Sequence, residues 1–467
     1  MRITRRTLLV GAGLGAVSVL LASCTDDEPE PTESATPAPT DTPSTPPSSV
    51  SEAVEGSDGP VPSAWYRSQW STDEFALGAA SFVTTGTTSA AREAFSRPLE
   101  GRVHFAGEAC DQGRPGTVLG AWDAGAAAAA AVTAVAAEDE RIAVIGAGIA
   151  GAKAARDLAD AGYEVTVIEA RKRVGGRVWS VVDDEWPIPV QLGAFTSRET
   201  SSSLVSLLAE HDLDVLDLDT FTGWSAQGET ATESGDAYNT AIADAAQQIN
   251  DVSVSDVIDA ADPAAAALLA WVSAFTGIDA AEASVRFAPD YPAETMRIAA
   301  GDLSVVFDAL LQDIEVTLST TVARVAYDDS GVSLQLGTGE AVSFDRVIVT
   351  VPIGVLAAGT LEFTPPLADA RLSAIEGLGA GAIEAVWLTF DEAFWATDAA
   401  IWLVEGGDGA IRTWLNLAPA TGEPVLVGLV GGQAAADFAA LDDDEAQAQA
   451  LASLAYFVPE PTPSPTP

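Results

Sequence analysis

The order of apolar and polar positions in residues 141–169 predicts a strand, a helix and a second strand in succession. The run RIAVIG, which begins at Arg141, is short, apolar and rich in β-branched side chains, as is typical of a strand buried in a parallel sheet. Residues 152–161 have a helical composition, and Gly162 follows as a residue that ends helices. The run EVTVIEA then predicts a strand that ends at Glu169. Together these segments predict one βαβ unit.

Similar patterns predict strands on both sides of this unit. Downstream, VSLQL (332–336) alternates between apolar and polar residues, GTGE (337–340) is typical of a turn, and RVIVTVP (346–352) is another buried run. Upstream, RVHFAG (102–107) is expected to be a strand buried beside the strand that begins at Arg141. These strands would extend the sheet of the βαβ unit.

Helical spacing appears in several other segments. Four of them lie at residues 116–125, 201–213, 262–278 and 300–314, and a fifth lies at 442–457. The third has Asp262 as its cap and Pro263 in its first turn. Trp271, Phe275 and Trp402 are candidates for the wall of a substrate pocket, although aromatic residues at helical spacing more often belong to a core.

Both ends of the chain differ in composition from the part between them. Residues 1–24 have a basic start, an apolar run and small residues, which indicates an export signal. Arg5–Arg6 resembles a twin-arginine signal, and the sequence LASC resembles the box at which bacterial lipoproteins are cleaved and lipidated, here on Cys24. An ordinary secretory peptide with a chance cysteine is the alternative.

The residues next to the signal, and those at the other end, are unsuited to a core. Residues 25–62 are rich in Pro, Thr and Ser and are expected to form a disordered tether, and residues 458–467 have the same character. The predicted location is therefore the cell envelope, at the outer face of the cytoplasmic membrane, with a lipid anchor as the only membrane attachment. Lipidation of Cys24 would leave Cys110 unpaired, so no disulfide within the chain is expected.

The charge of the chain limits its partners. The 467 residues are 48% hydrophobic, which allows a sizeable core in one large domain or two to three ordinary ones. The 68 acidic and 22 basic residues give a net charge of −46, a field that repels nucleic acid and anionic lipid. We therefore expect no nucleic-acid partner. An acidic, soluble surface explains this charge, and steering of cationic substrates is the alternative.

A glycine motif follows the first strand of the βαβ unit directly. Gly146 would permit the tight turn, Gly148 would let the backbone approach a pyrophosphate, and Gly151 would let the helix pack on the strand. Glu169 lies at the end of the second strand, where a carboxylate would bind a ribose hydroxyl. Strand, glycine turn, helix, strand and terminal acid in one unit predict a dinucleotide site.

The residues after Glu169 resemble a known family. In EARKRVGGR, the residues Arg171, Gly175, Gly176 and Arg177 resemble the signature of the flavin-containing amine oxidases. QLGAF (191–195) and the βββ segment that follows residue 319 resemble further parts of that family. The resemblance implies noncovalent FAD, because no cysteine stands beside Ala80, where some members attach the flavin. It also implies hydride transfer from the carbon next to an amine nitrogen to flavin N5, followed by reoxidation with oxygen that yields peroxide.

The closing part of the family's FAD domain stands before the βαβ unit. The stretch from Arg102 to Val132, RVHFAGEACDQGRPGTVLGAWDAGAAAAAAV, resembles the strand and helix with which members end, whereas nothing similar follows the FDEAFW segment. The order therefore resembles a circular permutation in which 141–457 followed by 63–137 restores the usual sequence. An unrelated fused fragment is the alternative. Glu108 would contact the ribityl or phosphate part of FAD, and the helix after Gly116 would point its positive end at the flavin.

The motif and the resemblance together give one set of expected cofactor contacts. These residues are Gly107, Glu108, Thr117, Val118, Gly146, Gly148, Ala150, Gly151, Glu169, Ala170, Arg171, Gly176, Arg177, Gly193, Ala194 and Val322. No metal site is expected, His104 is expected to be a core or edge residue, and Cys110 a small loop residue.

Two departures from the family affect the chemistry rather than the cofactor. Many members hold a water near N5 with a lysine inside G-x-x-x-K-V-x-L-x-F, but here GAIEAVWLTF carries Ala385 at that position. The two lysines of the chain, Lys153 and Lys172, both lie in the nucleotide-binding unit. Ala80 and Ala121 stand where relatives place aromatic residues. The catalytic residues are therefore unknown, and these departures affect amine oxidation while they leave the FAD site unchanged.

The sequence thus predicts an α/β protein: a Rossmann-like, three-layer ββα FAD domain, circularly permuted, with a mixed α+β substrate domain. The expected domain parts are 63–137 and 141–198 for FAD, 199–300 for a mainly helical substrate region, 301–366 for the return to the FAD domain, and 367–457 for substrate-domain strands and a helix. The expected function is FAD-dependent oxidation of a small molecule by hydride transfer to flavin N5, with an amine as the candidate substrate. The alternatives are an FAD-dependent desaturase or dehydrogenase, and a degenerate surface lipoprotein that keeps FAD. The oligomeric state is open.

Overall fold

The computed structural model describes residues 49–50, 60–197, 202–230, 235–291, 296–406 and 409–458. The expected export signal with Cys24, nearly all of the expected tether, and residues 459–467 lie outside the described residues. Within the described ranges, no helix combines the length and apolar character that a membrane span requires.

The βαβ unit forms the centre of a five-stranded parallel sheet. Its strands, in spatial order, are β14 (Glu315–Thr317), β6 (Glu164–Ile168), β5 (Arg141–Ile145), β18 (Arg346–Val349) and β4 (Val103–Phe105). Ile142, Val144 and Val347 are fully buried, as expected for strands covered on both faces. The strand β4 was expected to be buried beside β5; it lies in the same sheet, with β18 between the two and paired with both.

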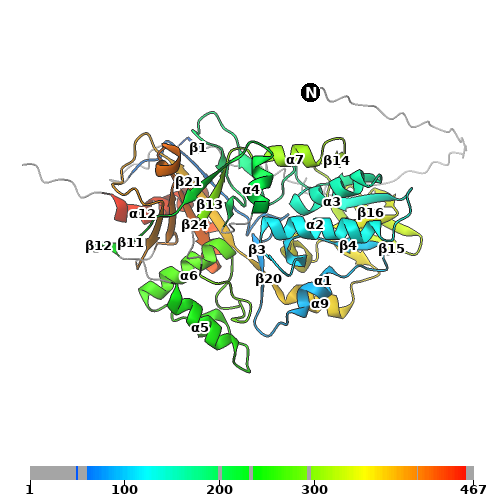
Figure 1. Ribbon diagram of the computed structural model, residues 1–467, viewed down its shortest axis with the longest axis horizontal. Helices are drawn as coiled ribbons and strands as arrows, with labels where there is room; N and C mark the ends of the chain where they lie inside the picture. Colours follow the sequence, from blue (N-terminus) through cyan, green and yellow to red (C-terminus); the bar gives the residue numbers. More distant parts are fainter. Residues whose placement is uncertain are drawn as a thin grey trace, which may run out of the picture. The chain divides into compact units, whose positions relative to one another are not determined.

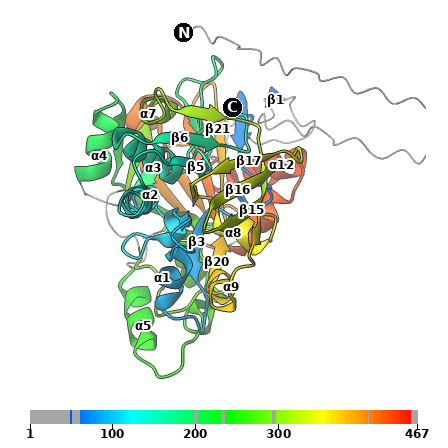
Figure 2. The same cartoon turned by 90° about the vertical axis from the view of Figure 1, so that its right-hand side faces the viewer.

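The parallel sheet is the middle of three layers (Figure 2). Helices α2 (Val118–Thr133), α3 (Ile149–Asp160) and α7 (Ser304–Leu310) cover one face, where Ile142 and Val144 point. The second sheet covers the other face, where Ala143 and Ile145 point. Its strands are β17 (Ala341–Phe344), β16 (Gly331–Leu336), β15 (Val322–Asp328) and β19 (Glu362–Thr364). The side chains of each strand thus alternate between two cores, and the expected three-layer ββα domain is present.

The fold has two halves. The three-layer domain is the first, and a large mixed sheet is the centre of the second (Figure 1). Its strands, in spatial order, are β1 (Ser49–Val50), β2 (Ala64–Arg67), β21 (Ile383–Thr389), β24 (Val425–Gly431), β23 (Thr413–Asn416), β22 (Ile401–Val404), β11 (Phe221–Ser225) and β12 (Gly228–Thr230). Helix α6 (Pro263–Thr276) packs on one face, and α11 (Gln433–Ala439) and α12 (Asp443–Ser453) on the other. Asp262 caps α6 through the N–H of Ala264, as the sequence predicts.

Shorter elements complete the structure. The pairs β3 (Ala80–Val83) with β20 (Leu378–Gly381), and β7 (Ser180–Val181) with β8 (Val190–Gln191), are two-stranded, and β10 (Asp214–Leu218), β13 (Met296–Ala300) and β9 (Thr196–Ser197) form a sheet of three. The further helices are α1 (Ala90–Ser96), α4 (Ser202–Ala209), α5 (Asp236–Ala246), α8 (Ile353–Ala357), α9 (Asp369–Glu376) and α10 (Ala418–Thr421), with 3-10 turns η1 (Glu108–Cys110), η2 (Val254–Asp256) and η3 (Ala455–Phe457). Residues 199–300, expected to be mainly helical, thus also contain the strands β10 to β13.

The segment that precedes the βαβ unit contributes to both halves. Its β2 pairs with β21, its β3 with β20, and its β4 with β18. The short connection to β5 is held by Arg346, which binds the carboxylate of Glu140 and the carbonyl of Val135. Residues 60–136 are therefore an integral part of the structure, because their strands pair with strands of both halves.

Candidate functional site

Two adjoining cavities lie where the two halves of the chain meet. The first, of about 270 Å³, opens at the carboxyl ends of β5, β6 and β18, the edge at which open α/β sheets bind ligands. The second, of about 390 Å³, reaches β21 and β24 of the large sheet and the end of α6. Both are lined by Ala79, Gly116, Thr117, Val118, Arg177 and Ala194. A ligand in the first cavity would therefore lie next to a molecule in the second.

The glycine motif has the geometry of a phosphate cradle. Gly146 has a φ of +104°, which allows the sharp turn after β5. A Cβ on Gly151 would lie 2.0 Å from the carbonyl oxygen of Gly146, so α3 packs on β5 only because this residue is glycine. Gly148 lines the first cavity as the N-cap of α3, and no side chain caps the helix. The N-terminal N–H groups of α3 therefore meet the cavity and can bind an anion there.

Glu169 ends β6 at the opposite side of this cradle. Its Oε2 accepts a hydrogen bond from the N–H of Ala147 (2.7 Å) and its Oε1 accepts from the N–H of Arg171 (2.8 Å). These two bonds fix the carboxylate against the glycine turn while it lines the cavity. Each oxygen retains a second lone pair, so the carboxylate can accept further hydrogen bonds from ligand hydroxyl groups.

Arg171 joins the early and late parts of the chain. Its two terminal nitrogens donate to the two carboxylate oxygens of Asp73, at 2.6 and 2.7 Å, in a bidentate pair. Its guanidinium also lies over the rings of Trp70 and Phe75. Arg171 is 6% exposed, so this pair is largely shielded from water. The segment around Asp73 is thereby held on the wall of the first cavity, which Glu74 and Phe75 also line.

Glu108 is the centre of a buried network between the cavities. Its carboxylate accepts hydrogen bonds from the Ser81 hydroxyl (2.5 Å), the Gly116 N–H (3.0 Å) and the Arg177 guanidinium (3.2 Å). Burial alone would raise the pKa of Glu108, but Arg177, Ser81 and Arg92 together hold it below its ordinary value. Glu108 is therefore an anion that positions Arg177 and the loop before α2.

The structure gathers most of the expected cofactor residues around the first cavity. Those that line it are Gly107, Glu108, Thr117, Val118, Gly146, Gly148, Ala150, Glu169, Ala170, Arg171, Gly176, Arg177, Ala194 and Val322. The two others are nearby: Gly151 packs against Gly146, and Gly193 lines the second cavity. A Cβ on Gly193 would lie 2.2 Å from the carbonyl oxygen of Arg177, which explains glycine there by packing.

Sequence reasoning missed other residues of the first cavity. Thr350, Val351 and Pro352 follow β18 and line the cavity beside Gly146. The hydroxyl of Thr350 donates to the carbonyl of Ile145, so it also closes the turn after β5. The signal was present in the sequence, because these residues end the buried run RVIVTVP, and residues at the carboxyl ends of parallel strands are those that meet ligands.

Two of the three departures from the family pattern lie in the second cavity. Ala80 and Ala385 line it, and Ala121 lines the first cavity. Among its described lining residues there is no lysine. Lys153 lies on α3, where it pairs with Asp157 and stacks on Trp122.

Of the aromatic residues proposed for a pocket, only Phe275 lines the second cavity. Trp271 and Trp402 are fully buried on opposite faces of the large sheet. Trp70 and Phe195, which were not proposed as pocket aromatics, line the second cavity. His104 is buried within β4, where burial lowers its pKa, and burial raises the pKa of the Cys110 thiol. Neither residue lines either cavity.

The comparison with known proteins gives the family. The sequence model of the family described as flavin containing amine oxidoreductase matches residues 48–133, 149–252 and 241–466. The chain belongs to this family. The probable polyamine oxidase 4 of Arabidopsis thaliana is 30% identical over 362 residues, which cover 68% of this chain and 71% of that protein.

Two further proteins are similar to this chain at lower sequence identity. Polyamine oxidase 4 of rice (Oryza sativa subsp. japonica) is 29% identical over 364 residues, which are 68% of this chain and 73% of that protein. A triple mutant of putrescine oxidase, redesigned in its cofactor binding, is a solved structure with a TM-score of 0.55 and 22% identity, covering 69% of this chain and 82% of that one. This last likeness shows the fold alone.

The first cavity fits the cofactor of the family. It offers an uncapped helix N-terminus and a close-approach glycine for a diphosphate, and a carboxylate for a ribose. It continues into a second, mainly apolar space where a ring system can meet a substrate. FAD is therefore the cofactor of this family member, and the chain is an FAD-dependent oxidoreductase of the amine oxidase type.

Proposed function

We propose that the second cavity receives a small amine and that the carbon next to its nitrogen is oxidised there. FAD bound in the first cavity supplies the hydride acceptor. The observation that carries this proposal is the shared lining of the two cavities, because Ala79, Thr117, Val118 and Ala194 would contact both the cofactor and the substrate. The side chains of this protein position the two molecules rather than exchange protons with them.

The arrangement of charges supports this role. Arg177 lies at the junction of the cavities and is held by Glu108 and by the carbonyl of Ala79. The walls beyond it are mostly apolar, including Leu192, Ile383 and Leu429, so a bound substrate would displace water from the reacting carbon. Orientation and exclusion of water are the contributions expected of the protein when a cofactor carries the chemistry.

The test is an anaerobic titration of the purified, yellow protein with a panel of amines. Loss of the oxidised flavin spectrum on addition of an amine supports the proposal, and a flavin that no amine reduces contradicts it. Ala80→Trp fills part of the second cavity and is expected to weaken reduction by amines. The exposed variant Ala137→Ser, which leaves both cavities unchanged, is the control.

A dehydrogenase with little reactivity toward oxygen is the second candidate. Ala385 favours it, because this residue lines the second cavity at the position where a lysine is expected. Reduction of the flavin by an amine without release of peroxide in air would identify this function. An FAD-containing binding protein is the remaining alternative, and a flavin that no donor reduces would favour it.

We also propose that the protein is attached to the outer face of the cytoplasmic membrane through lipid on Cys24. The basic start, the apolar run and the sequence LASC support this location. Cys24→Ala is expected to move the protein from the membrane fraction to the soluble fraction. A wild-type protein that is already soluble after cell breakage would contradict the proposal.

We propose, finally, that the order of the domain parts is a circular permutation of the family. The pairing of β4 with β18, and the short connection between α2 and β5, support it. In a permuted chain the former ends are joined by such a short connection, and the new ends lie at a surface.

A further inference from the structure

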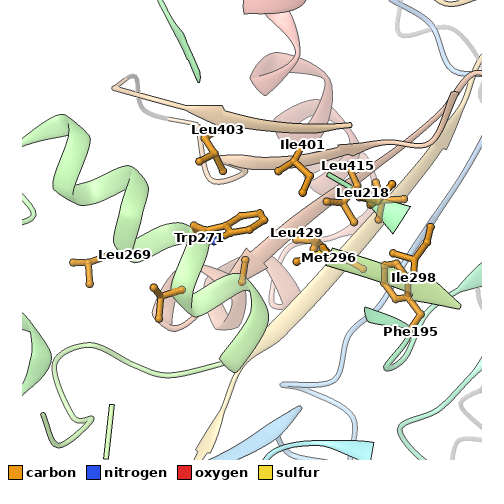
Figure 3. Close-up of a cluster of buried hydrophobic side chains, with 14 of the residues drawn as sticks. Phe195, Leu218, Leu269, Trp271, Met296, Ile298, Ile401, Leu403, Leu415 and Leu429 are labelled. Atoms are coloured by element: carbon orange, nitrogen blue, oxygen red, sulfur yellow. The ribbon is translucent and has the colours of Figure 1, made fainter. Parts of the chain in front are cut away.

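The described lining residues of the second cavity include no acidic residue, although the chain is strongly acidic. The chain has 68 acidic residues, yet no Asp, Glu, Lys or His occurs among the described residues that line this cavity. Its larger apolar side chains are those of Trp70, Leu119, Leu192, Phe195, Phe275, Ile383 and Leu429. Phe195 and Leu429 also belong to the cluster of buried apolar side chains in Figure 3. The cavity is thus an apolar space rather than an acidic one.

Among the described lining residues, the single charged side chain cannot attract an ammonium group. Arg177 is positive, and Glu108, which neutralises it, is 5% exposed and lines only the first cavity. The carboxylate of Glu384 lies behind Ser68, and it is fully buried with hydrogen bonds from Ser68, Trp70 and Ser71. No carboxylate among the described lining residues therefore faces a bound amine.

An ammonium group in such a cavity would lose its water without gaining a counterion from the described lining residues. The desolvation of an unpaired charge costs several kcal/mol in proteins, so a bound amine is favoured as its free base. The remaining polar groups suit a neutral amine: Thr196 and Ser197, from β9, are among the lining residues, and a hydroxyl group that faces the cavity can accept a hydrogen bond from an N–H group. The apolar walls stabilise a bound carbon chain, because each buried methylene group is removed from water.

We propose that the substrate is a monoamine with an apolar chain or ring, bound as the free base, and that diamines and polyamines are poor substrates. This inference rests on the proposed amine oxidation. A diamine that places one nitrogen at the reacting end would bring a second ammonium group into the apolar part of the cavity. The acidic surface does not change this, because it would concentrate all amine cations near the protein without selecting among them.

The experiment compares hexylamine with 1,5-diaminopentane, which have equal numbers of non-hydrogen atoms. The purified FAD-loaded protein is titrated with each amine anaerobically, and binding is also measured by calorimetry. We expect hexylamine to reduce the flavin and to bind at least tenfold more tightly than the diamine, which corresponds to about 1.4 kcal/mol. Affinity for hexylamine should rise with pH, because the free base becomes more abundant.

Variants that add a carboxylate test the physical reason. Leu429→Glu is expected to improve binding of the diamine relative to hexylamine, whereas Leu429→Gln, which has nearly the same size and no charge, is not. Ala274→Asp with Ala274→Asn is a second matched pair on α6, used if Leu429→Glu does not retain flavin. Carboxylate variants that leave the preference unchanged would contradict the inference.

The outcomes separate this inference from the proposed function. If no amine reduces the flavin and none binds, the proposed function fails. If the wild-type protein oxidises the diamine as well as or better than hexylamine, amine oxidation stands and the inference about substrate class is overturned.

Discussion

Replacement of Glu384 by glutamine would disturb the contact between β21 and the segment that follows β2. One oxygen of the Glu384 carboxylate accepts from the N–H and the hydroxyl of Ser71, at 2.9 and 2.8 Å. The other accepts from the hydroxyl of Ser68 (2.6 Å) and the N–H of Trp70 (3.0 Å). A glutamine amide has one acceptor oxygen and one NH₂ group, so it cannot accept hydrogen bonds from all four donors.

The loss in free energy of unfolding can be estimated from the hydrogen-bond donors that would lose their acceptor. Hydroxyl groups can rotate, but in either orientation of the amide the N–H of Trp70 or that of Ser71 would face the NH₂ group of the glutamine. A buried donor without an acceptor costs about 1–3 kcal/mol, and the remaining bonds weaken because they no longer involve a charge. The smaller desolvation of a neutral amide offsets part of this loss. We expect the free energy of unfolding to fall by about 2 kcal/mol.

Urea unfolding at pH 7, followed by tryptophan fluorescence, measures this difference. Glu362→Gln is the matched control, because Glu362 forms an exposed pair with Arg324 and its removal is expected to change stability by less than about 1 kcal/mol. If Glu384→Gln unfolds at the same urea concentration as the wild type, the reasoning about the four hydrogen bonds is refuted.

The pH dependence gives a second check on the same residue. Burial raises the pKa of Glu384 above its ordinary value near 4.5, although the hydrogen bonds from Ser68, Ser71 and Trp70 oppose this shift. A raised pKa in the folded protein means that the contribution of this carboxyl group to stability is complete below pH 4.5 and is lost as the pH rises through its folded value. The stability difference between the wild type and Glu384→Gln should therefore be larger at pH 5 than at pH 8. A difference that grows with pH would contradict the raised pKa.

Three further predictions concern the cofactor site and the order of the chain. Glu108→Gln should lower the ratio of flavin to protein at pH 7. Because the pKa of Glu108 is lowered in the folded protein, the wild type should be more stable than Glu108→Gln above pH 4.5, and this difference should shrink as the pH falls below that value. Gly151→Ala should abolish flavin-containing protein in an absorption spectrum, because its Cβ would lie 2.0 Å from the Gly146 oxygen, whereas Gly337→Ala, with no atom closer than 3.5 Å, should not. A reordered chain has residues 141–458 first, then a flexible linker and residues 60–137. It should fold and bind FAD with a melting temperature near that of the wild type, whereas residues 141–458 alone should neither fold stably nor bind FAD. If residues 141–458 alone are stable and yellow, the alternative of an unrelated fused fragment is favoured.

The phosphate cradle could be predicted because its signal is local. The turn after β5, the start of α3 and the end of β6 lie within about thirty residues, and each has a residue type with one evident structural reason, such as Gly146 for the turn. Most of the expected cofactor residues accordingly line one cavity. The order of the strands was harder to predict from the sequence. The position of β18 between β4 and β5 depends on pairings between strands that are more than two hundred residues apart in the chain.

The second cavity could not be assembled from the sequence for the same reason. Its walls come from segments as distant as Trp70, Phe195, Phe275 and Leu429, none of which has a motif. The pairs that join these segments were also missed: Arg171 meets Asp73 across 98 positions, and Glu384 meets Ser68 across 316. A charged residue shows its partner only when the fold brings the two together.

The distribution of residues 60–136 over both halves determines when the molecule can fold during its synthesis. Strand β2 is made early, but its neighbour β21 leaves the ribosome more than three hundred residues later, and β4 waits similarly for β18. Until then the edges of both early strands lack their partners, which exposes a nascent chain to wrong pairing. Because Val355, Thr360 and Leu361 also line the first cavity, FAD can be enclosed there only after the chain has been made as far as residue 361.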